Sequence, residues 1–300
     1  MRSIRWGLCC QFLDAPIRFR TATHKYVATL NVAARREYLH AIARENARAL
    51  LAAIERCSEL GIGAFRINSQ ILPLVTHPVT GYRLADIDED GSIHRTFTNA
   101  GERAGAAGVR LSFHPDQFVV LNSEQERVVL SSLAEMEAQG AIASLVGADV
   151  LTLHGGGTAG GMPEALERLE RGIERLDPVA RARVALENDD RSFTPEALLP
   201  LCERLGVPLV YDVHHHRCLP DAMDIATATS RAAATWKDRE PYFHISSPRD
   251  GWKGACRPHA DFVDPRDFPD EWRSLKLSVD VEAKAKERAV LALRDAVAFA

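Results

Sequence analysis

The stretch Val150-Leu151-Thr152-Leu153-His154-Gly155-Gly156-Gly157 is a short apolar run that ends in a histidine and three glycines. A longer amphipathic run follows at residues 163–176 and begins with Pro163. Proline is tolerated in the first turn of a helix because an N–H at that position would have no partner. The two runs therefore predict a strand followed by a helix, with His154 at the carboxyl end of the strand.

The same alternation of short apolar runs and longer amphipathic runs continues in both directions along the chain. Strands are expected at residues 4–10, 62–67, 109–113, 150–153, 184–186, 209–213, 242–245 and 275–281. Helices are expected at residues 35–60, 100–107, 124–146, 163–176, 195–205, 220–236 and 283–299. About eight strand-then-helix units are typical of a closed parallel barrel. The sequence therefore predicts a (β/α)8 TIM barrel.

Residues that commonly start and stop helices support this division of the chain. Gly108, Gly147 and Gly206 each precede an expected strand, where a glycine can end a helix. Thr194 is placed to cap one helix, and Pro220 is placed near the first turn of the next. Long loops at residues 11–34, 70–99 and 247–272 interrupt the pattern, and long loops in a compact barrel are usually functional.

Length and composition favour a single domain over residues 1–300. With 46% hydrophobic residues the chain can bury a full core, and a (β/α) barrel uses about 250 residues. The net charge of −4 gives no overall basic field, so a polyanionic partner must be met by a local basic face or by bound cations.

The cysteines and the apolar runs indicate the cellular compartment of the protein. Six scattered cysteines, without the paired spacing of a zinc ribbon or a disulfide framework, favour reduced thiols and a cytoplasmic protein. The N-terminus has no cleavage pattern, and no stretch approaches the roughly 20 apolar residues of a membrane helix. We expect a monomer with neither a membrane nor a protein partner.

Polar residues directly after different strands form a second pattern. All strands of such a barrel end at the same face, so residues that follow them converge although they are far apart in sequence. His114, His154, Glu187, Asp212, His244 and Glu282 stand at these positions, and His77, His215 and His259 lie on segments that can reach the same mouth. The sequence therefore predicts a metal cluster at the C-terminal mouth of the barrel.

The number of these residues and the kind of their ligand atoms restrict which metals they can bind and which reaction the site can support. A catalytic zinc takes about three protein ligands, so two or three divalent ions are expected. Nitrogen and oxygen ligands without thiolates suit Mn²⁺, Zn²⁺ or Fe²⁺ better than Ca²⁺ or Mg²⁺. Clustered ions generate hydroxide and stabilise the attacking and leaving oxygens of a displacement. Phosphate-ester hydrolysis needs that help because its uncatalysed rate is very slow.

The other histidines have a plainer interpretation. A single histidine is more often a satisfied core or surface residue than a ligand. His214 and His216 flank His215, and in an extended segment their side chains point away from it, so we place them around the ligands or at the surface. His24, His40 and His94 have no comparable context and are expected to be solvated.

Sequence motifs run through most of the chain. They are Arg66-Ile67-Asn68-Ser69 with Thr76-His77, Phe113-His114-Pro115-Asp116-Gln117, Leu153-His154-Gly155-Gly156, Leu186-Glu187-Asn188-Asp189-Asp190, Asp212 with His215, His244-Ile245-Ser246-Ser247, His259-Ala260-Asp261-Phe262 and Glu282-Ala283-Lys284-Ala285-Lys286-Glu287. Together they resemble the UV damage endonuclease family, which is similar to the endonuclease IV and xylose isomerase barrels. The resemblance implies a repair nuclease that cuts damaged double-stranded DNA immediately 5′ to a lesion, with up to three ions, often manganese.

The resemblance also implies roles for individual residues. Glu187, Asp212 and Glu282 are the expected catalytic carboxylates, because with the histidines they hold the ions that activate hydroxide. Gln117 and Phe118 correspond to the pair that enters the duplex opposite the damage, where a tyrosine is usual at the second position.

Two more residues are assigned to DNA binding. Trp252, on the third long loop, can stack on a base. Asn188 is assigned to the same group, with capping of the next helix or support of a ligand imidazole as the alternatives.

Two further positions, besides Phe118, depart from the family's pattern. The Gly-Tyr pair expected near the first strand appears as Gly7-Leu8, which removes an aromatic expected to contact the damaged nucleotides. The family's modified lysine two residues before His244 is replaced by Tyr242, so an anion near the metals is lost. Hydrolytic metal chemistry is therefore a firmer expectation than the substrate.

Two other enzyme classes remain open. A sugar isomerase or epimerase of the xylose isomerase kind would use the same mouth for two ions and a small polyhydroxylated substrate, without affinity for DNA. A multi-iron oxidoreductase on a related barrel would suit the imidazole-rich ligand set. A pure binding or storage protein is disfavoured, because storage does not require this many ligands at one open mouth.

Overall fold

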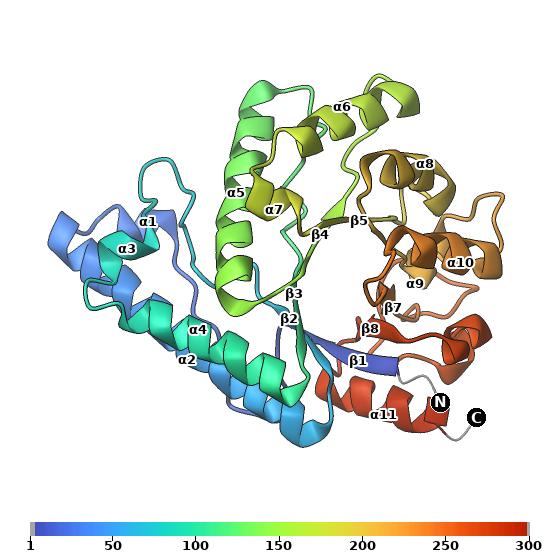
Figure 1. Ribbon diagram of the computed structural model, residues 1–300, viewed down its shortest axis with the longest axis horizontal. Coiled ribbons are helices and arrows are strands. Elements are labelled where there is room, and N and C mark those ends of the chain that lie inside the picture. Colours follow the sequence, from blue (N-terminus) through green and yellow to red (C-terminus); the bar gives the residue numbers. More distant parts are fainter. Residues whose placement is uncertain (1–3, 299–300) are drawn as a thin grey trace.

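The computed structural model describes residues 4–298, in which eight strands form one parallel sheet. The strands are β1 (Ile4–Cys9), β2 (Ala64–Ile67), β3 (Arg110–Phe113), β4 (Val150–His154), β5 (Val184–Glu187), β6 (Leu209–Val210), β7 (Tyr242–Ile245) and β8 (Leu277–Val281). They follow the order β6-β5-β4-β3-β2-β1-β8-β7. A bridge between Asp212 and His244 links the end of β6 to β7, so the ring in Figure 1 is nearly closed.

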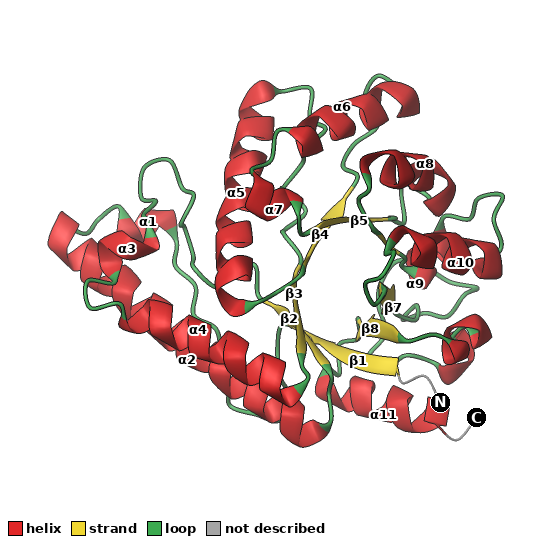
Figure 2. Cartoon of the chain, in the orientation of Figure 1, coloured by secondary structure: helices red, strands yellow, loops and turns green. Residues whose placement is uncertain are grey.

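The helices surround this ring, as Figure 2 shows. They are α1 (His24–Val27), α2 (Val32–Leu60), α3 (Leu84–Ile87), α4 (Ser92–Ala107), α5 (Glu126–Val146), α6 (Met162–Glu174), α7 (Pro178–Arg181), α8 (Pro195–Leu205), α9 (Val213–Cys218), α10 (Ile225–Thr235) and α11 (Glu287–Ala298). Short 3₁₀ turns, η1 (Pro265–Asp267) and η2 (Asp270–Ser274), lie between β7 and β8. The predicted (β/α)8 barrel is confirmed.

Most sequence signals for helix ends are confirmed. Gly108, Gly147 and Gly206 follow α4, α5 and α8 with φ of 67°, 72° and 64°, a conformation that L side chains rarely adopt. The Thr194 hydroxyl accepts a hydrogen bond from the N–H of Ala197 and caps α8. These residues fix where the barrel's helices stop and start.

The segment after β6 differs from its expectation. The strand predicted at residues 209–213 ends at Val210, because Asp212 accepts a hydrogen bond from the N–H of His215 at 2.7 Å and thereby starts α9. The helix predicted at residues 220–236 begins at Ile225, capped by Asp224, so Pro220 does not start it. The loops expected at residues 11–34 and 70–99 also contain α1, α3 and the first turns of α4.

Apolar side chains occupy the layer between the strands and the helices, whereas the interior of the ring is partly polar. Phe65 on β2 and Phe97 on α4 are fully buried in the apolar core. Inside the ring, the hydroxyl groups of Ser112 on β3 and Tyr242 on β7 lie 2.9 Å apart, although these strands are not neighbours. Polar groups therefore form the floor below the barrel mouth.

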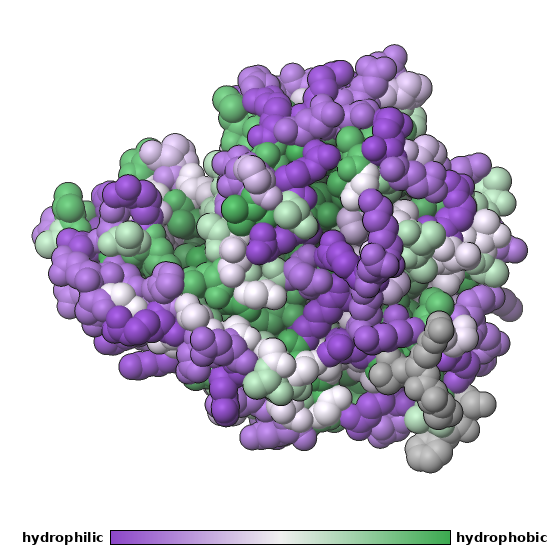
Figure 3. Space-filling model, viewed as in Figure 1, coloured by the Kyte–Doolittle hydropathy of each residue, from purple (hydrophilic) through white to green (hydrophobic). Residues whose placement is uncertain are grey.

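The outer surface carries mostly polar side chains in the view of Figure 3, with apolar ones gathered toward the middle. Within residues 4–298, no helix is both long enough and apolar enough to cross a bilayer.

Candidate metal centre

Glu187 lies at the centre of the candidate site. It is the last residue of β5, and its side chain is only 1% exposed. Three groups of closely spaced ligand atoms share it, and within each group these atoms lie within 4.8 Å of one another. The groups are Glu187 with His114 and His154, Glu187 with Asp212 and His215, and Glu187 with His244 and Glu282. The barrel mouth thus brings together seven of the nine expected ligands.

Each carboxylate oxygen of Glu187 faces its own pair of imidazoles. Oε2 lies 2.8 Å from His114 Nε2 and 3.7 Å from His154 Nε2. Oε1 lies 2.8 Å from His244 Nδ1 and 3.6 Å from His215 Nδ1. A carboxylate with imidazole nitrogens beside both of its oxygens could hold a divalent ion on either side.

Backbone carbonyls orient two of these imidazoles. His114 Nδ1 lies 3.0 Å from the carbonyl of Pro115, and His215 Nδ1 lies 2.9 Å from the carbonyl of Asn188. An imidazole that donates its Nδ1–H to a carbonyl keeps the Nε2 lone pair free for an ion. His114 is therefore held with Nε2 toward Glu187, as a metal ligand would be, whereas His215 directs the same Nδ1 toward the carbonyl and the Glu187 carboxylate.

Two buried polar atoms at the site lack a hydrogen-bond partner among the described residues. They are Asp212 Oδ2 and His154 Nδ1, and both belong to predicted ligands. Buried polar atoms are nearly always paired, so an orphan atom in a folded protein calls for an explanation. Together with the oxygen and nitrogen donor set, these atoms fit a site that holds divalent ions.

The two ligands predicted on long loops lie in different places. His259 Nδ1 is 3.7 Å from Glu282 Oε2, so His259 stands at the rim of the cluster. The ring of His77 instead stacks on His24, with ring centres 4.0 Å apart, and its Nδ1 accepts hydrogen bonds from the N–H groups of Val79 and Thr80. Among the described residues, none of the three ligand groups includes His77.

Asn188 braces the segment that carries Asp212. Its side chain is fully buried, its amide donates to the carbonyl of Asp212 at 2.8 Å, and its Oδ1 accepts from the N–H of Asp212 at 2.9 Å. The backbone carbonyl of Asn188, and not its side chain, contacts His215 Nδ1. A contact of Asn188 with DNA stays a prediction of the sequence.

In the metal-free cluster, neighbouring charges shift the pKa values of Glu187 and His215. Burial disfavours the charged form of Glu187, but the positive charges of His244 and His154 outweigh it and hold the pKa of this carboxyl well below its usual range. Burial likewise opposes protonation of His215, yet the carboxylates of Asp212 and Glu187 raise the pKa of His215 to about 9. In the absence of ions, protons therefore supply part of the positive charge at the site.

The raised pKa of His215 predicts how the stability of the metal-free protein depends on pH. The folded state binds this proton more tightly than the unfolded state, whose imidazole has a pKa near 6.5. The resulting stability is complete below about pH 6.5 and is lost as the pH rises through about 9, a loss of about 3 kcal/mol. Urea unfolding of metal-stripped protein between these limits should show it, and His215→Asn should flatten the dependence. An unchanged slope in that variant would rule out His215 as the source.

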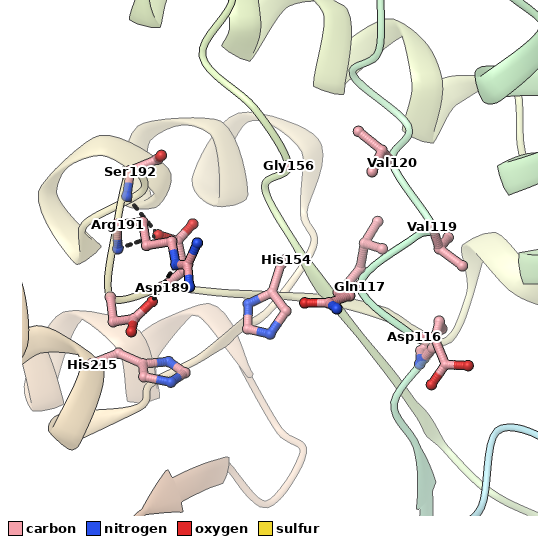
Figure 4. A pocket seen from close by; sticks show the side chains of 13 residues that line it. Asp116, Gln117, Val119, Val120, His154, Gly156, Asp189, Arg191, Ser192 and His215 are labelled. Carbon is pink, nitrogen blue, oxygen red and sulfur yellow. Dashed lines mark hydrogen bonds and ion pairs between the residues drawn. The ribbon is translucent and has the colours of Figure 1, made fainter. Parts of the chain in front are cut away.

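The cluster opens to solvent through two adjoining cavities. A groove of about 660 Å³ is lined by Glu187, Glu282 and the expected DNA-binding residues Gln117 and Phe118. A second cavity, of about 350 Å³, lies beside it, and Figure 4 shows Gln117 on one side of His154 and Asp189 on the other. A large substrate can therefore reach the cluster past Gln117 and Phe118.

The expected DNA-binding aromatics differ in exposure. Phe118 is 80% exposed beside the groove. Trp252 is 40% exposed, and its indole N–H donates to Asp267 Oδ1 at 2.8 Å, which fixes the ring. Leu8, which stands where the family has an aromatic residue, is fully buried in the apolar core.

Several predictions for the other histidines are also corrected. His214 and His216 lie on α9 rather than on an extended segment, and both are buried. His216 Nδ1 is 2.7 Å from the Tyr211 hydroxyl, which makes it a structural residue. His24 and His40 are half-buried rather than solvated, whereas His94 is exposed as expected.

Sequence reasoning missed the polar side chains beneath the cluster. Arg66 Nη2 lies 2.6 Å from Glu282 Oε1, and Arg66 Nε donates to Asp280 Oδ2 at 2.8 Å. A signal was present, because Ser278, Asp280 and Glu282 alternate with apolar residues along β8 and its end. Such alternation places polar side chains on one face of a strand, which here is the interior of the ring.

Fold and site together define a TIM-barrel protein with an imidazole and carboxylate cluster at the mouth. The chain belongs to the UV damage endonuclease family, since the family described as UV-endonuclease UvdE matches residues 4–299. The UV DNA damage endonuclease of Deinococcus radiodurans is 35% identical over 96% of this chain and 94% of its own length. The enzyme of the same name from Bacillus velezensis is 31% identical over 91% of this chain and 87% of its own.

Solved structures agree with this assignment. The crystal structure of SacUVDE has a TM-score of 0.88 and 25% identity, and the match covers 99% of each chain. Endonuclease IV from Thermus thermophilus matches with a TM-score of 0.65 at 17% identity, over 99% of this chain and 100% of its own, which shows a shared fold. The family resemblance of the motifs is therefore confirmed.

Proposed function

We propose that this chain is a metal-dependent DNA repair endonuclease that nicks the backbone immediately 5′ to UV photoproducts and related lesions. The observation that carries this proposal is the buried Glu187, whose two oxygens face separate pairs of imidazoles at the end of an open groove. The substrate class is supported by relatives named UV DNA damage endonuclease. We further propose that it acts on double-stranded DNA as a cytoplasmic monomer.

Two to three divalent ions fit the ligand set, manganese first and zinc or iron as alternatives. The side chains that would hold them are His114, His154, Glu187, Asp212, His215, His244 and Glu282, with His259 at the rim. His77 stays a prediction of the sequence alone. Bound ions would supply a hydroxide nucleophile and stabilise the oxygens of the cleaved phosphodiester.

The chain's own residues would perform the remaining tasks. Glu187, Asp212 and Glu282 are proposed as the catalytic carboxylates because they bring negative charge to the place where cations are needed, two of them buried and Glu282 15% exposed. Gln117 and Phe118 would enter the duplex opposite the lesion, and Trp252 would stack on a base. With a net charge of −4, DNA binding must rely on these local contacts and on the cations.

A nicking assay tests the proposal. Metal-stripped protein would be resupplied with Mn²⁺, Zn²⁺ or Fe²⁺ and given a labelled duplex with one defined photoproduct, alongside the undamaged duplex. We expect a cut immediately 5′ to the photoproduct that depends on added metal. If fully metal-loaded protein leaves the damaged duplex intact, the proposal fails, and oxygen uptake or the conversion of small sugars becomes the next assay.

The exposed ring of Phe118 gives a prediction about lesion binding. Stacking of an aromatic side chain on a base contributes about 1–3 kcal/mol, so Phe118→Ala should weaken binding to the damaged duplex by about 5- to 160-fold. Fluorescence anisotropy with labelled duplex would measure it. Leu130→Ala is the control, since Leu130 on α5 is 53% exposed and does not line the groove. Equal binding by both variants would remove Phe118 from the DNA interface.

A further inference from the structure

A continuous line of hydrogen bonds runs beneath the candidate metal centre. The Tyr242 hydroxyl on β7 donates to Asp280 Oδ1 on β8 at 2.7 Å, and Asp280 Oδ2 accepts from Arg66 Nε on β2 at 2.8 Å. Arg66 Nη2 then lies 2.6 Å from Glu282 Oε1 and 3.0 Å from His244 Nε2. The line therefore ends on two of the candidate ligands.

The line is closed to solvent at its base. Tyr242 and Asp280 are 0% exposed and Arg66 is 8% exposed. A buried arginine is costly unless carboxylates pair with it, and here Asp280 and Glu282 both do.

The two ends of Asp280 are fixed by different partners. Tyr242 occupies Oδ1 and Arg66 occupies Oδ2, and the Ser112 hydroxyl contacts the Tyr242 oxygen from β3. If the Tyr242 hydroxyl were absent, Oδ1 of Asp280 would be an unpaired buried acceptor. The Asp280 carboxylate would then rotate, and its hydrogen bond to Arg66 would change. The guanidinium would then move relative to Glu282.

At the other end of this line, Arg66 fixes the orientation of the Glu282 carboxylate. It holds Oε1 of Glu282, while Oε2 faces His259 at 3.7 Å and stays on the side of the mouth. Glu282 also belongs to the ligand group that contains Glu187 and His244. The Oε1 that Arg66 holds also lies 3.5 Å from His244 Nδ1, so the guanidinium fixes the Glu282 carboxylate within that ligand group.

We propose that Tyr242 is a positioning residue of the metal centre, which acts through Asp280 and Arg66 to hold Glu282 in the orientation that binds a divalent ion. The proposal rests on the proposed function only in assuming that the cluster binds divalent ions. Groups that orient metal ligands from behind typically change metal affinity by about 10- to 100-fold when they are removed. Tyr242 is expected to act at that scale.

The test compares two buried tyrosines by calorimetric titration of metal-stripped protein with Mn²⁺ alone. Tyr242→Phe should weaken binding of at least one ion by about 10-fold or more. Tyr211→Phe is the control, because Tyr211 is also 0% exposed and its hydroxyl makes a buried contact, 2.7 Å to His216 Nδ1, which continues to Asp221 and not to the cluster. Tyr242→Phe loses two buried hydrogen bonds and Tyr211→Phe loses one, so both variants should melt at lower temperature, whereas only Tyr242→Phe should lose metal affinity.

Kinetics on damaged duplex give a second readout. Tyr242→Phe should lower kcat at a fixed Mn²⁺ concentration with KM for DNA unchanged, and excess Mn²⁺ should restore part of the loss. If Tyr242→Phe does not fold, Asp280→Asn breaks the line at its next member and should weaken Mn²⁺ binding to the same degree. Mn²⁺ affinity equal to wild type in the folded variant overturns the proposal. Wild-type protein that binds Mn²⁺ but cuts no DNA would instead refute the proposed function and leave this inference standing.

Discussion

Glu187→Gln should reduce nicking of damaged duplex by about 1,000-fold or more and lower the number of Mn²⁺ ions bound. The substitution keeps the shape of the side chain but removes the negative charge that faces four imidazoles, two on each oxygen. An amide offers one oxygen in place of two, so it cannot bridge two ions. Loss of one preorganised electrostatic group alone typically costs 10²- to 10³-fold in kcat.

Glu287→Gln is the matched control for this experiment. Glu287 is 2% exposed, and its carboxylate accepts hydrogen bonds from the N–H groups of Leu13 and Asp14, outside the three ligand groups. It should lose stability but keep metal and activity. Metal content by mass spectrometry and single-turnover nicking measure both outcomes. If Glu187→Gln cuts as fast as wild type, Glu187 is not the central ligand.

The sequence predicted the barrel because its signals are local and repeated. Strand and helix periodicity, together with glycines such as Gly108 and Gly147, act within a few residues of where they stand. One of the errors comes from a competing local interaction. Asp212 was expected at the end of a strand, but its hydrogen bond to the N–H of His215 starts a helix there and shortens β6.

The convergence of the ligands could be predicted because it follows from topology alone. Residues after parallel strands meet at one face, and this places Glu187, His244 and Glu282 together whatever the loops do. Side-chain direction and pairing do not follow from topology. The burial of Asn188, and the stacking of His77 on His24, depend on loop conformation and could not be read from the order of residues.

The polar side chains on the floor of the barrel show a different limit of prediction from sequence. Arg66 and Asp280 lie more than two hundred residues apart, and no local pattern pairs them. What the sequence shows is a polar residue at a strand position whose neighbours are apolar. A buried charge of this kind requires a partner, so the pattern predicts that a partner exists without saying which residue it is.

Gly7→Ala should lower the free energy of unfolding by about 3 kcal/mol. β1 and β8 pair so that Gly7 faces Asp280, and a Cβ at Gly7 would lie 2.2 Å from Asp280 Oδ1. The carboxylate cannot simply turn away, because Tyr242 holds one oxygen and Arg66 holds the other. Accommodating the methyl group therefore means breaking a buried hydrogen bond or separating the two strands.

Gly105→Ala is the control, with an effect of opposite sign. Gly105 lies within α4, and a Cβ there would meet nothing within 4 Å among the described residues. Alanine is the better helix former, so this variant should gain about 0.5–1 kcal/mol. Urea unfolding of both metal-free variants at neutral pH measures the difference. If Gly7→Ala were as stable as wild type, Asp280 would have to be free to move, and Tyr242 could not act on Glu282 through it.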